Sequence, residues 1–436
     1  MLVMPRTILL FALLACSSFV LAQNHAARAQ SPTPTPDPYK IIALEFRGST
    51  RFTSEDISAA TGLTVGSDGH EENLQQALQV LSESGMFRDM KYTGTTSYLG
   101  KKVTFILTDE KTLYPLRFDN FVWLSESDLL AELKRRVPFF RGQVPGVGHM
   151  SDQIAEQLEA ILKEKGVQAG VEGRPEGGID SSKITSYLYT VKGVHTPIRK
   201  FEFAGASPAL ETLLQQRSGE KLGRDYSVME LTDFTHRELL TIYQRRGYVQ
   251  AKFSAPQAQP VAPGENAVIV RLAVAEGSCY SLREVHWEGN TAMDAAQLQA
   301  SLHLKPGEPA NLIQLKFDLQ VVQGAYKKLG YLDAAAKVDA EYDDAAAKVD
   351  FRIVISEGKL YHYGPLHTEG LSEEQGALVQ SQWQKLSGAV ADPELLRSFT
   401  VGVRLIKNLA SYKIQMRQMK NSADGVISLE LIFTGN

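Results

Sequence analysis

Cysteine is almost absent from this chain of 436 residues, which holds only Cys16 and Cys279. Cys16 lies in an apolar N-terminal run that we interpret as an export signal, so cleavage would leave one thiol. One cysteine cannot form a disulfide within the chain. The domains must therefore be stabilised by their own hydrophobic cores. Cys279 begins an apolar stretch, and we expect a buried structural thiol there rather than a nucleophile.

Positive charge is not in excess. Residues 1–22 carry one charged side chain, Arg6, which leaves 45 of the 46 basic residues against 50 acidic ones, a net charge of −5. The composition therefore offers no basic excess that would bind nucleic acid or an anionic membrane, and nucleic acid is not an expected partner.

The sequence also lacks catalytic signatures. It has no HExxH, GxSxG, phosphate-loop or CxxC motif, so no enzyme, no catalytic residue and no cofactor is expected. His362 and His367 lie close to Glu369, but surface histidines often lie near one another by chance, and we expect no metal site.

The N-terminus has the pattern of an export signal. Arg6 precedes the apolar run Thr7–Ala22, and small residues permit cleavage after Ala22 or after Ala29. The run is short for a transmembrane span, which needs about 20 residues. A second reading is that "LLAC" forms a lipoprotein box, in which Cys16 would carry the lipid. The proline-rich segment that follows, "SPTPTPDP", predicts an extended tether.

A repeat of about eighty residues organises the rest of the chain. Glycines that follow a helical end recur at a spacing of 81 to 83 residues, and a fifth equivalent falls at Ser411. The four glycines are Gly85, Gly166, Gly247 and Gly330. A fixed spacing indicates one folding unit that is copied. The predicted segments are 1–22 signal peptide, 23–39 linker, and units 40–111, 112–194, 195–277, 278–358 and 359–436, the last of them divergent.

Each unit has the pattern strand, helix, helix, strand, strand. The first strand alternates polar and apolar residues, as in "IRKFEFAG", which is typical of a sheet with one covered face. The first helix follows a side chain that can cap it, for which we predict Ser54, Ser125, Ser207, Asp294 and Ser372. In the fourth unit Leu312, Leu315 and Leu319 begin an apolar stripe of the second helix. The fold class is therefore α+β, with about five βααββ domains, each placing two helices on a three-stranded mixed sheet.

The phrase "GY" ends the second helix in two units. Gly247 and Gly330 are expected to be left-handed caps, and Tyr248 and Tyr331 to pack beside the helix before the second strand starts. Basic residues in the last turn suit the negative end of the helix dipole, so they receive no binding role.

These motifs resemble tandem POTRA domains, the polypeptide-transport-associated modules of BamA-type outer-membrane assembly proteins and two-partner secretion transporters. The resemblance depends on the βααββ order, the "GY" phrase, the "EG" junctions and above all the stretch Arg283–Glu308. It covers residues from Lys40 to the end. BamA-type proteins continue into a membrane β-barrel, whereas this chain ends at Asn436, so we expect no barrel. In the fifth unit, Gly364 and Pro365 are expected to break the first strand.

The resemblance implies binding rather than catalysis. POTRA sheets are similar to modules that receive an extended peptide along an exposed edge, and in the family that edge is the second strand. The predicted second strands are Met86–Thr93, Val167–Glu172, Tyr248–Ser254, Tyr331–Val338 and Tyr412–Met419. We select the third as the peptide-binding edge because it alternates cleanly. Its residues are Tyr248, Val249, Gln250, Ala251, Lys252, Phe253 and Ser254. Neighbouring units could also cover any of these edges.

The expected function is a periplasmic, outer-membrane-associated scaffold without enzymatic activity. Its expected partners are unfolded outer-membrane proteins or a separately encoded β-barrel or assembly subunit, and it would reach the membrane only through partners or lipidation at Cys16. An alternative is an N-terminally anchored POTRA component, held by a lipid or by the inner membrane, of an envelope secretion or division complex. Another is a separately encoded POTRA arm that works with a barrel made by another gene.

Overall fold

The computed structural model describes residues 37–177, 183–406 and 409–435. The predicted signal peptide, most of the predicted linker and Cys16 lie outside these residues. The chain divides into two compact parts, one ending at Lys111 and one running from Thr112 onward, and each is described by itself.

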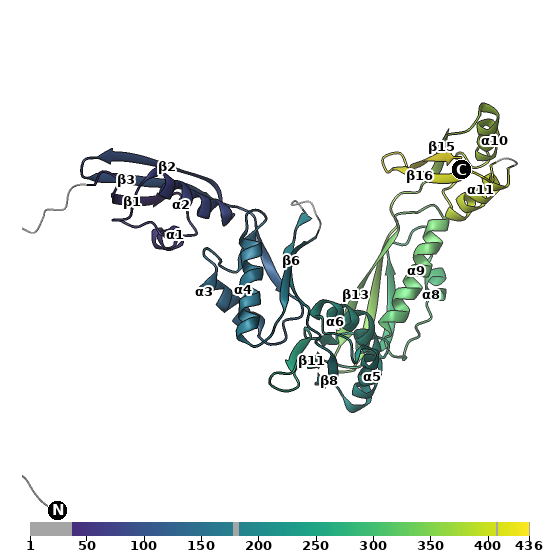
Figure 1. Ribbon diagram of the computed structural model, residues 1–436. Helices are drawn as coiled ribbons and strands as arrows, with labels where there is room; N and C mark the ends of the chain where they lie inside the picture. The colour runs from purple at the N-terminus through teal and green to yellow at the C-terminus, as the bar shows by residue number, and fades with distance from the viewer. Residues whose placement is uncertain (1–36, 178–182, 407–408, 436) are drawn as a thin grey trace, which may run out of the picture. The chain divides into compact units, whose positions relative to one another are not determined.

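The first part is one sheet with two helices (Figure 1). Its elements are β1 (Ile41–Arg47), α1 (Ser54–Thr61), α2 (Glu71–Glu83), β2 (Phe87–Ser97) and β3 (Gly100–Asp109). The strand order is β1-β3-β2, with β1 parallel and β2 antiparallel to β3. Alternate residues of β3, among them Phe105 and Leu107, are buried together with Leu74 and Leu81 of α2. One face of the sheet is therefore covered, as the alternation predicts.

The second part holds four more sheets. We name each sheet with its helices a module, numbered first to fifth along the chain. The second module contains β4 (Leu113–Phe118), α3 (Glu126–Arg136), β5 (Gln143–Pro145), α4 (Met150–Glu164), β6 (Gly170–Glu176) and β7 (Ser186–Lys192). The third contains β8 (Ile198–Ala204), α5 (Pro208–Ser218), η2 (Gly219–Lys221), α6 (Val228–Phe234), the π-helical turn η3 (Thr235–Leu239), α7 (Leu240–Gln244), β9 (Lys252–Phe253), β10 (Gln257–Pro260) and β11 (Val268–Ala275).

The fourth and fifth modules repeat the same order. The fourth contains β12 (Ser281–Glu288), α8 (Ala295–Ala300), α9 (Leu312–Lys328), β13 (Ala335–Asp343) and β14 (Lys348–Ser356). The fifth contains β15 (His362–Glu369), α10 (Glu373–Trp383), α11 (Pro393–Leu405), β16 (Lys413–Asn421) and β17 (Val426–Thr434).

The topology confirms the α+β fold class and the βααββ order. In every sheet the last strand of the module lies in the middle, parallel to the first strand and antiparallel to the second. The expectation of three strands everywhere is wrong for two modules. In the second, the short strand β5 pairs with β4, and in the third the second strand is divided into β9 and β10, which both pair with β11.

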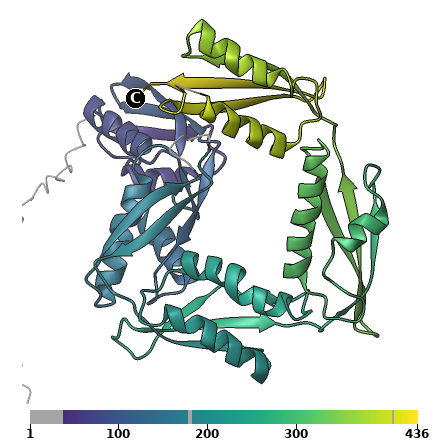
Figure 2. The same cartoon turned by 90° about the vertical axis from the view of Figure 1, so that its right-hand side faces the viewer.

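The core of the fourth module shows how the two helices share one face of a sheet. Val349, Phe351 and Ile353 alternate along β14 and form one buried cluster with Leu298 of α8 and Val322 of α9. Figure 2 shows α9, in green, lying lengthwise beside the strands of this sheet. Burying such side chains stabilises a fold by about 1.5–3 kcal/mol each.

Capping side chains begin most first helices where the sequence predicts them. Ser125, Asp294 and Ser372 accept the expected backbone hydrogen bonds. The prediction of Ser54 is wrong, because Thr53 is the cap of α1. Ser207 precedes α5, but its hydroxyl donates to Glu276 instead of accepting from the helix.

Two further expectations are corrected. β15 continues through Gly364 and Pro365, because a register shift between Tyr363 and Leu366 absorbs them without ending the strand. Cys279 is exposed in the loop before β12, where its thiol donates to the carbonyl of Arg246 at 3.1 Å, so the buried-thiol expectation is wrong.

Among the described helices, none is both long and apolar enough to cross a bilayer.

Candidate peptide-binding edges

The second strand of every module lies at an edge of its sheet. These edge strands are β2, β6, the pair β9 and β10, β13 and β16. An edge strand presents backbone N–H and C=O groups that the strands of its own sheet do not use. Such a row of groups can accept an added strand, whatever the added sequence is.

The predicted edge Tyr248–Ser254 is not one continuous strand. Only Lys252 and Phe253 pair with β11, at Ala275 and Val274. The residues before them form a turn that is closed by the N–H of Ala251, which donates to the carbonyl of Tyr248. After them, Pro256 ends the pairing until β10 begins. This edge is therefore shorter than its alternating sequence indicates.

The prediction of a continuous strand at Tyr248–Ser254 failed because the turn that replaces it also places every second or third side chain against the core. Tyr248 packs edge-on against Tyr243, with ring centroids 5.7 Å apart, and Phe253 contacts the same ring at 5.6 Å. Ala251 is buried, and the hydroxyl of Ser254 accepts from the N–H of Ala273. Val249 packs against the core of the fourth module, and Gln250 lies in the turn.

The fourth module has the same arrangement at Tyr331. This ring lies edge-on to Tyr326 at 6.1 Å, and the N–H of Ala334 donates to the carbonyl of Tyr331. β13 begins only at Ala335. In both modules the tyrosine therefore belongs to the turn, and the predicted strand start at the tyrosine is wrong.

The four repeated glycines have positive φ angles of 67°, 82°, 87° and 85° at Gly85, Gly166, Gly247 and Gly330. Two of these glycines also accept a backbone hydrogen bond from the module that follows. The N–H of Tyr280 donates to the carbonyl of Gly247 at 2.9 Å, and the N–H of Tyr361 donates to that of Gly330 at 3.0 Å. The glycines at these two junctions thus end a helix and receive the following first strand.

β13 borders an apolar groove in the fourth module. The groove has a volume of about 320 Å³, and its floor lies between the second helix and the edge strand. Leu312, Leu315 and Leu319 of α9 line one side, and Ala336 and Val338 of β13 line the other. Lys316, Gln320 and Gln323 complete the lining, which includes no acidic residue. The groove can receive alternate side chains of a strand that pairs with β13.

The fifth module has a similar groove of about 390 Å³ between α11 and β16. Leu396 and Val401 of α11 and Met416 of β16 supply its apolar lining, and Arg397 and Arg404 lie at its rim. The corresponding surface of the first module, between α2 and β2, is lined mostly by polar residues such as Gln75 and Gln79.

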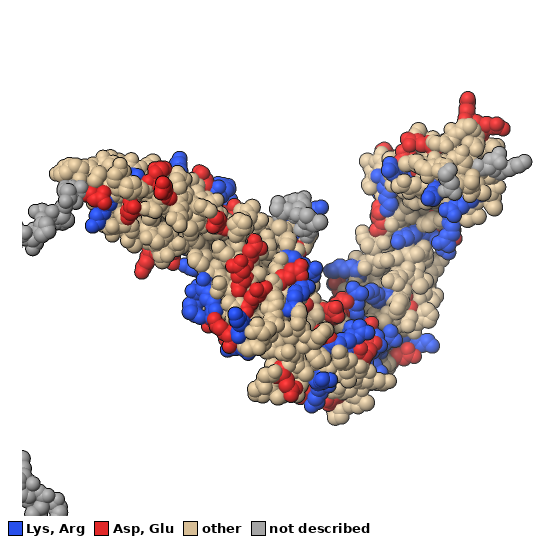
Figure 3. Space-filling model, viewed as in Figure 1, with Lys and Arg blue, Asp and Glu red and all other residues tan. Residues whose placement is uncertain are grey.

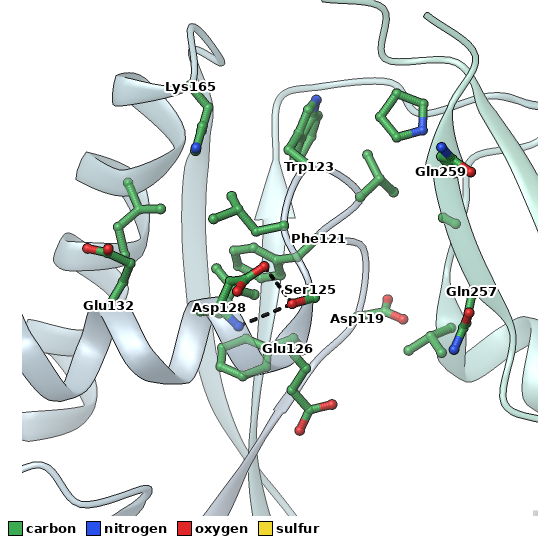
Figure 4. Close-up of a pocket in the computed structure, with 18 of the residues that line it drawn as sticks. Asp119, Phe121, Trp123, Ser125, Glu126, Asp128, Glu132, Lys165, Gln257 and Gln259 are labelled. Atoms are coloured by element: carbon green, nitrogen blue, oxygen red, sulfur yellow. Dashed lines mark hydrogen bonds between the residues drawn. The ribbon is translucent and has the colours of Figure 1, made fainter. Parts of the chain in front are cut away.

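A cavity of about 840 Å³ lies between the second and third modules (Figure 4). Asp119 accepts hydrogen bonds from the hydroxyl of Ser227, at 2.8 Å, and from the N–H of Met229, at 3.1 Å, so its carboxylate begins α6. Ser125 and Asp128 bond to each other in the same way at the start of α3. These acidic groups hold helices in place, which argues for a structural junction rather than a catalytic site.

Charged side chains of both signs are interspersed over the face seen in Figure 3. One acidic pair with a histidine could hold a cation, since ligand atoms of His367, Glu369 and Glu430 lie within 4.8 Å of one another. Glu430 also binds Arg417, at 3.2 Å. His362, which the sequence places nearby, is not in this group.

Sequence reasoning missed the groove residues. The sequence shows the apolar stripe of α9, but no pattern in it indicates that Lys316 and Gln320 line a groove. An acid lies at the end of the last strand, or directly after it, in the first, third and fourth modules. In the third and fourth it was visible in the sequence as "EG", but its role was not. Glu357 accepts from the N–H groups of Thr291, at 2.6 Å, and Ala292, at 2.8 Å. The acid thus fixes the loop between the first strand and the first helix.

Comparison with known proteins bears on this repeated unit. Residues 280–358, which span the fourth module, match the POTRA family, described as "Surface antigen variable number repeat". The fourth module therefore matches a POTRA domain. POTRA domains are non-enzymatic scaffolds, and the four other sheets repeat the strand order of the matched one.

Among curated proteins, a Treponema pallidum (strain Nichols) protein named "Putative outer membrane protein assembly factor" is 24% identical over 170 residues. The match covers 38% of this chain and 20% of the length of that relative.

Two solved structures are also similar. Haemophilus influenzae BamA POTRA3-5 is 14% identical, with a TM-score of 0.41, covering 55% of this chain and 96% of that one. POTRA1-3 of Omp85 from Anabaena is 13% identical, with a TM-score of 0.28, covering 55% and 95%.

Proposed function

We propose that this protein is a periplasmic scaffold that helps the assembly or secretion of outer-membrane proteins by adding extended peptides to its exposed sheet edges. The family match and the relative named as an assembly factor support the general role. The observation that carries the finer proposal is the apolar groove beside the edge strand β13.

The edge and the groove act together in this proposal. Backbone groups of β13 would pair with the client, and its alternate side chains would enter the groove between β13 and α9. Backbone pairing is tolerant of sequence, which suits a scaffold that handles many clients. We place the first site at β13 rather than at Tyr248–Ser254, because β9 offers only two paired residues whereas β13 offers nine.

We also propose that each of the five sheets is the core of one domain, with the boundaries predicted above. The partners would be unfolded outer-membrane proteins or another assembly subunit, met in the periplasm close to the outer membrane. The edges β16 and β2 would be further sites, of which β16 has the more apolar groove.

The test fills the groove without touching the core. Gln320 is exposed on α9 and lines the groove, so Gln320→Trp should occupy the space that client side chains need. The probe is a fluorescent peptide of about nine residues, matched to β13, with alternating apolar and polar residues. We expect its affinity, measured by anisotropy, to fall about fivefold or more, or about 1 kcal/mol.

The matched control is Lys328→Trp, on an exposed position of the same helix outside the groove. It should leave the affinity unchanged. Hydrogen exchange of Ala335–Asp343 should slow when the peptide binds the original chain. Equal affinities of the two tryptophan variants, or unchanged exchange in β13, would remove this edge as the binding site.

A further inference from the structure

The turn between β2 and β3 in the first module exposes two large apolar side chains. Tyr98 is 75% and Leu99 56% exposed, between Ser97 at the end of β2 and Gly100 at the start of β3. Neither has a positive φ angle, so the backbone of this turn does not demand particular side chains. Polar residues would serve the turn equally well.

Three more exposed apolar residues lie at the same end of the module. They are Tyr39, Ile42 and Val65. The N–H of Lys101 donates to the carbonyl of Lys40 at 2.8 Å, which holds the hairpin turn beside the start of β1. The loop that carries Val65 is tied to the same strand, because the N–H of Gly66 donates to the carbonyl of Ile41 at 2.7 Å. Figure 1 shows the hairpin turn beside the first described residues.

The hairpin has a charge opposite to that of the whole chain. Residues 90–108 include Lys91, Lys101 and Lys102 and no acidic residue, whereas the chain has a net charge of −4. Two of these lysines follow the turn directly. Three acidic groups also lie near this end. Asp37 accepts from the N–H of Tyr39 at 2.9 Å, and Asp68 is paired with His70. The pKa of Glu71 is lowered mainly by hydrogen bonds from Tyr92 and Gln75, and to a smaller extent by the charge of Lys101.

We propose that this end of the first module, made of Tyr39, Ile42, Val65, Tyr98 and Leu99 with Lys40, Lys101 and Lys102, binds the surface of an anionic phospholipid bilayer. A protruding turn can enter the headgroup region, whereas a protein partner would need a pocket to receive it. Tyrosine suits the boundary between headgroups and acyl chains. The lysines would lie at the level of the lipid phosphates and attract them.

This surface is independent of the sheet edges that we propose for clients. It would hold the first module against a membrane while the edge strands of later modules stay free. It also gives residues of the folded part a membrane contact that does not depend on Cys16.

The test uses the chain from Gln23 onward, which contains every described residue but not the apolar run 7–22. Binding is measured by sedimentation with vesicles of phosphatidylcholine alone or with about one third phosphatidylglycerol, as anionic lipid strengthens such binding. We expect binding to the anionic vesicles, weakened by added salt. The double variant Tyr98→Ser with Leu99→Ser should bind roughly tenfold more weakly.

Two further variants distinguish binding through this end of the first module from nonspecific adsorption to vesicles. Val261→Ser removes an exposed apolar side chain just after β10 in the third module and should change nothing. Lys102→Gln, at an exposed lysine, should weaken binding to anionic vesicles only. Circular dichroism shows whether the variants are folded. Absence of vesicle binding, equal binding by the double variant, or self-association through this end without vesicle binding would overturn the proposal.

Discussion

At the scale of single residues, glycines with the same backbone conformation have different surroundings. A Cβ atom at Gly247 would lie 2.4 Å from the carbonyl oxygen of Tyr280, and one at Gly330 would lie 2.6 Å from Val390. A Cβ at Gly166 would meet nothing within 4 Å. Sequence spacing makes these three positions equivalent, but only two of them have a neighbouring module packed against the glycine.

We therefore expect Gly247→Ala to destabilise the protein more than Gly166→Ala does. Both substitutions place an alanine at positive φ, which costs about 1–2 kcal/mol. Gly247→Ala must in addition push Tyr280 away and break the junction. Urea unfolding would measure the difference, and thiol labelling of Cys279, which lies at that junction, should become faster only in Gly247→Ala. Equal stabilities would show that the junction contributes nothing.

At the scale of elements, an acid at the end of the central strand fixes the loop before the first helix. Asp109 accepts from the hydroxyl of Ser49 and the N–H of Thr50, and Glu276 accepts from the N–H and hydroxyl of Ser207. Glu357 does the same in the fourth module. Burial alone would raise the pKa of Glu357, but the hydrogen bonds from Thr291 and Ala292 leave it below the usual value. The pKa of Asp109 is lowered against burial in the same way.

This arrangement predicts loss of stability in acid. A carboxyl group with a lowered pKa in the folded state stabilises the fold at pH values above its unfolded pKa, which is about 4. That stability is lost as the pH falls through the folded pKa. We expect Glu357→Gln to lower the stability of the fourth module at pH 7 by about 1–3 kcal/mol and to weaken its pH dependence. Urea unfolding between pH 7 and 3 measures both, and exposed Glu341→Gln should change neither.

At the scale of the whole molecule, hydrophobic cores are confined to single modules with small overlaps. The buried clusters of the third, fourth and fifth modules share no residue. Val122 of the second module belongs to the third module's cluster, and Val249 and Leu332 each pack against the next cluster along the chain. Such an array can open one module at a time. The junction glycines and tyrosines are the contacts that would couple neighbours.

A substitution at Phe351 can test whether the modules unfold separately, because the side chain of Phe351 is fully buried in the fourth module. Phe351→Ala should cost about 3–5 kcal/mol there. Hydrogen exchange followed by mass spectrometry should show lost protection within 280–358 and retained protection in β8 and β11. The reciprocal variant Phe201→Ala should affect the third module instead. Loss of protection throughout residues 112–435 in either variant would mean that these modules unfold together.

The amino-acid pattern was sufficient to predict the repeat, the order of helices and strands and the fold class, because period-two and helical patterns follow from which face each element must bury. The sequence also predicted local hydrogen bonds correctly, such as the helix caps at Ser125, Asp294 and Ser372. Even the edge position of the second strands followed from the resemblance that the motifs support.

Which of those edges can pair with an added strand depends on the packed fold. The alternation of apolar residues in Tyr248–Ser254 is typical of a strand. A turn is equally compatible with it, because the rings of Tyr248 and Phe253 both pack against Tyr243. The groove beside β13 and the apolar end at Tyr98 and Leu99 are formed by segments distant in the chain. Their proximity depends on how helices and strands pack, and a local pattern carries no information about that.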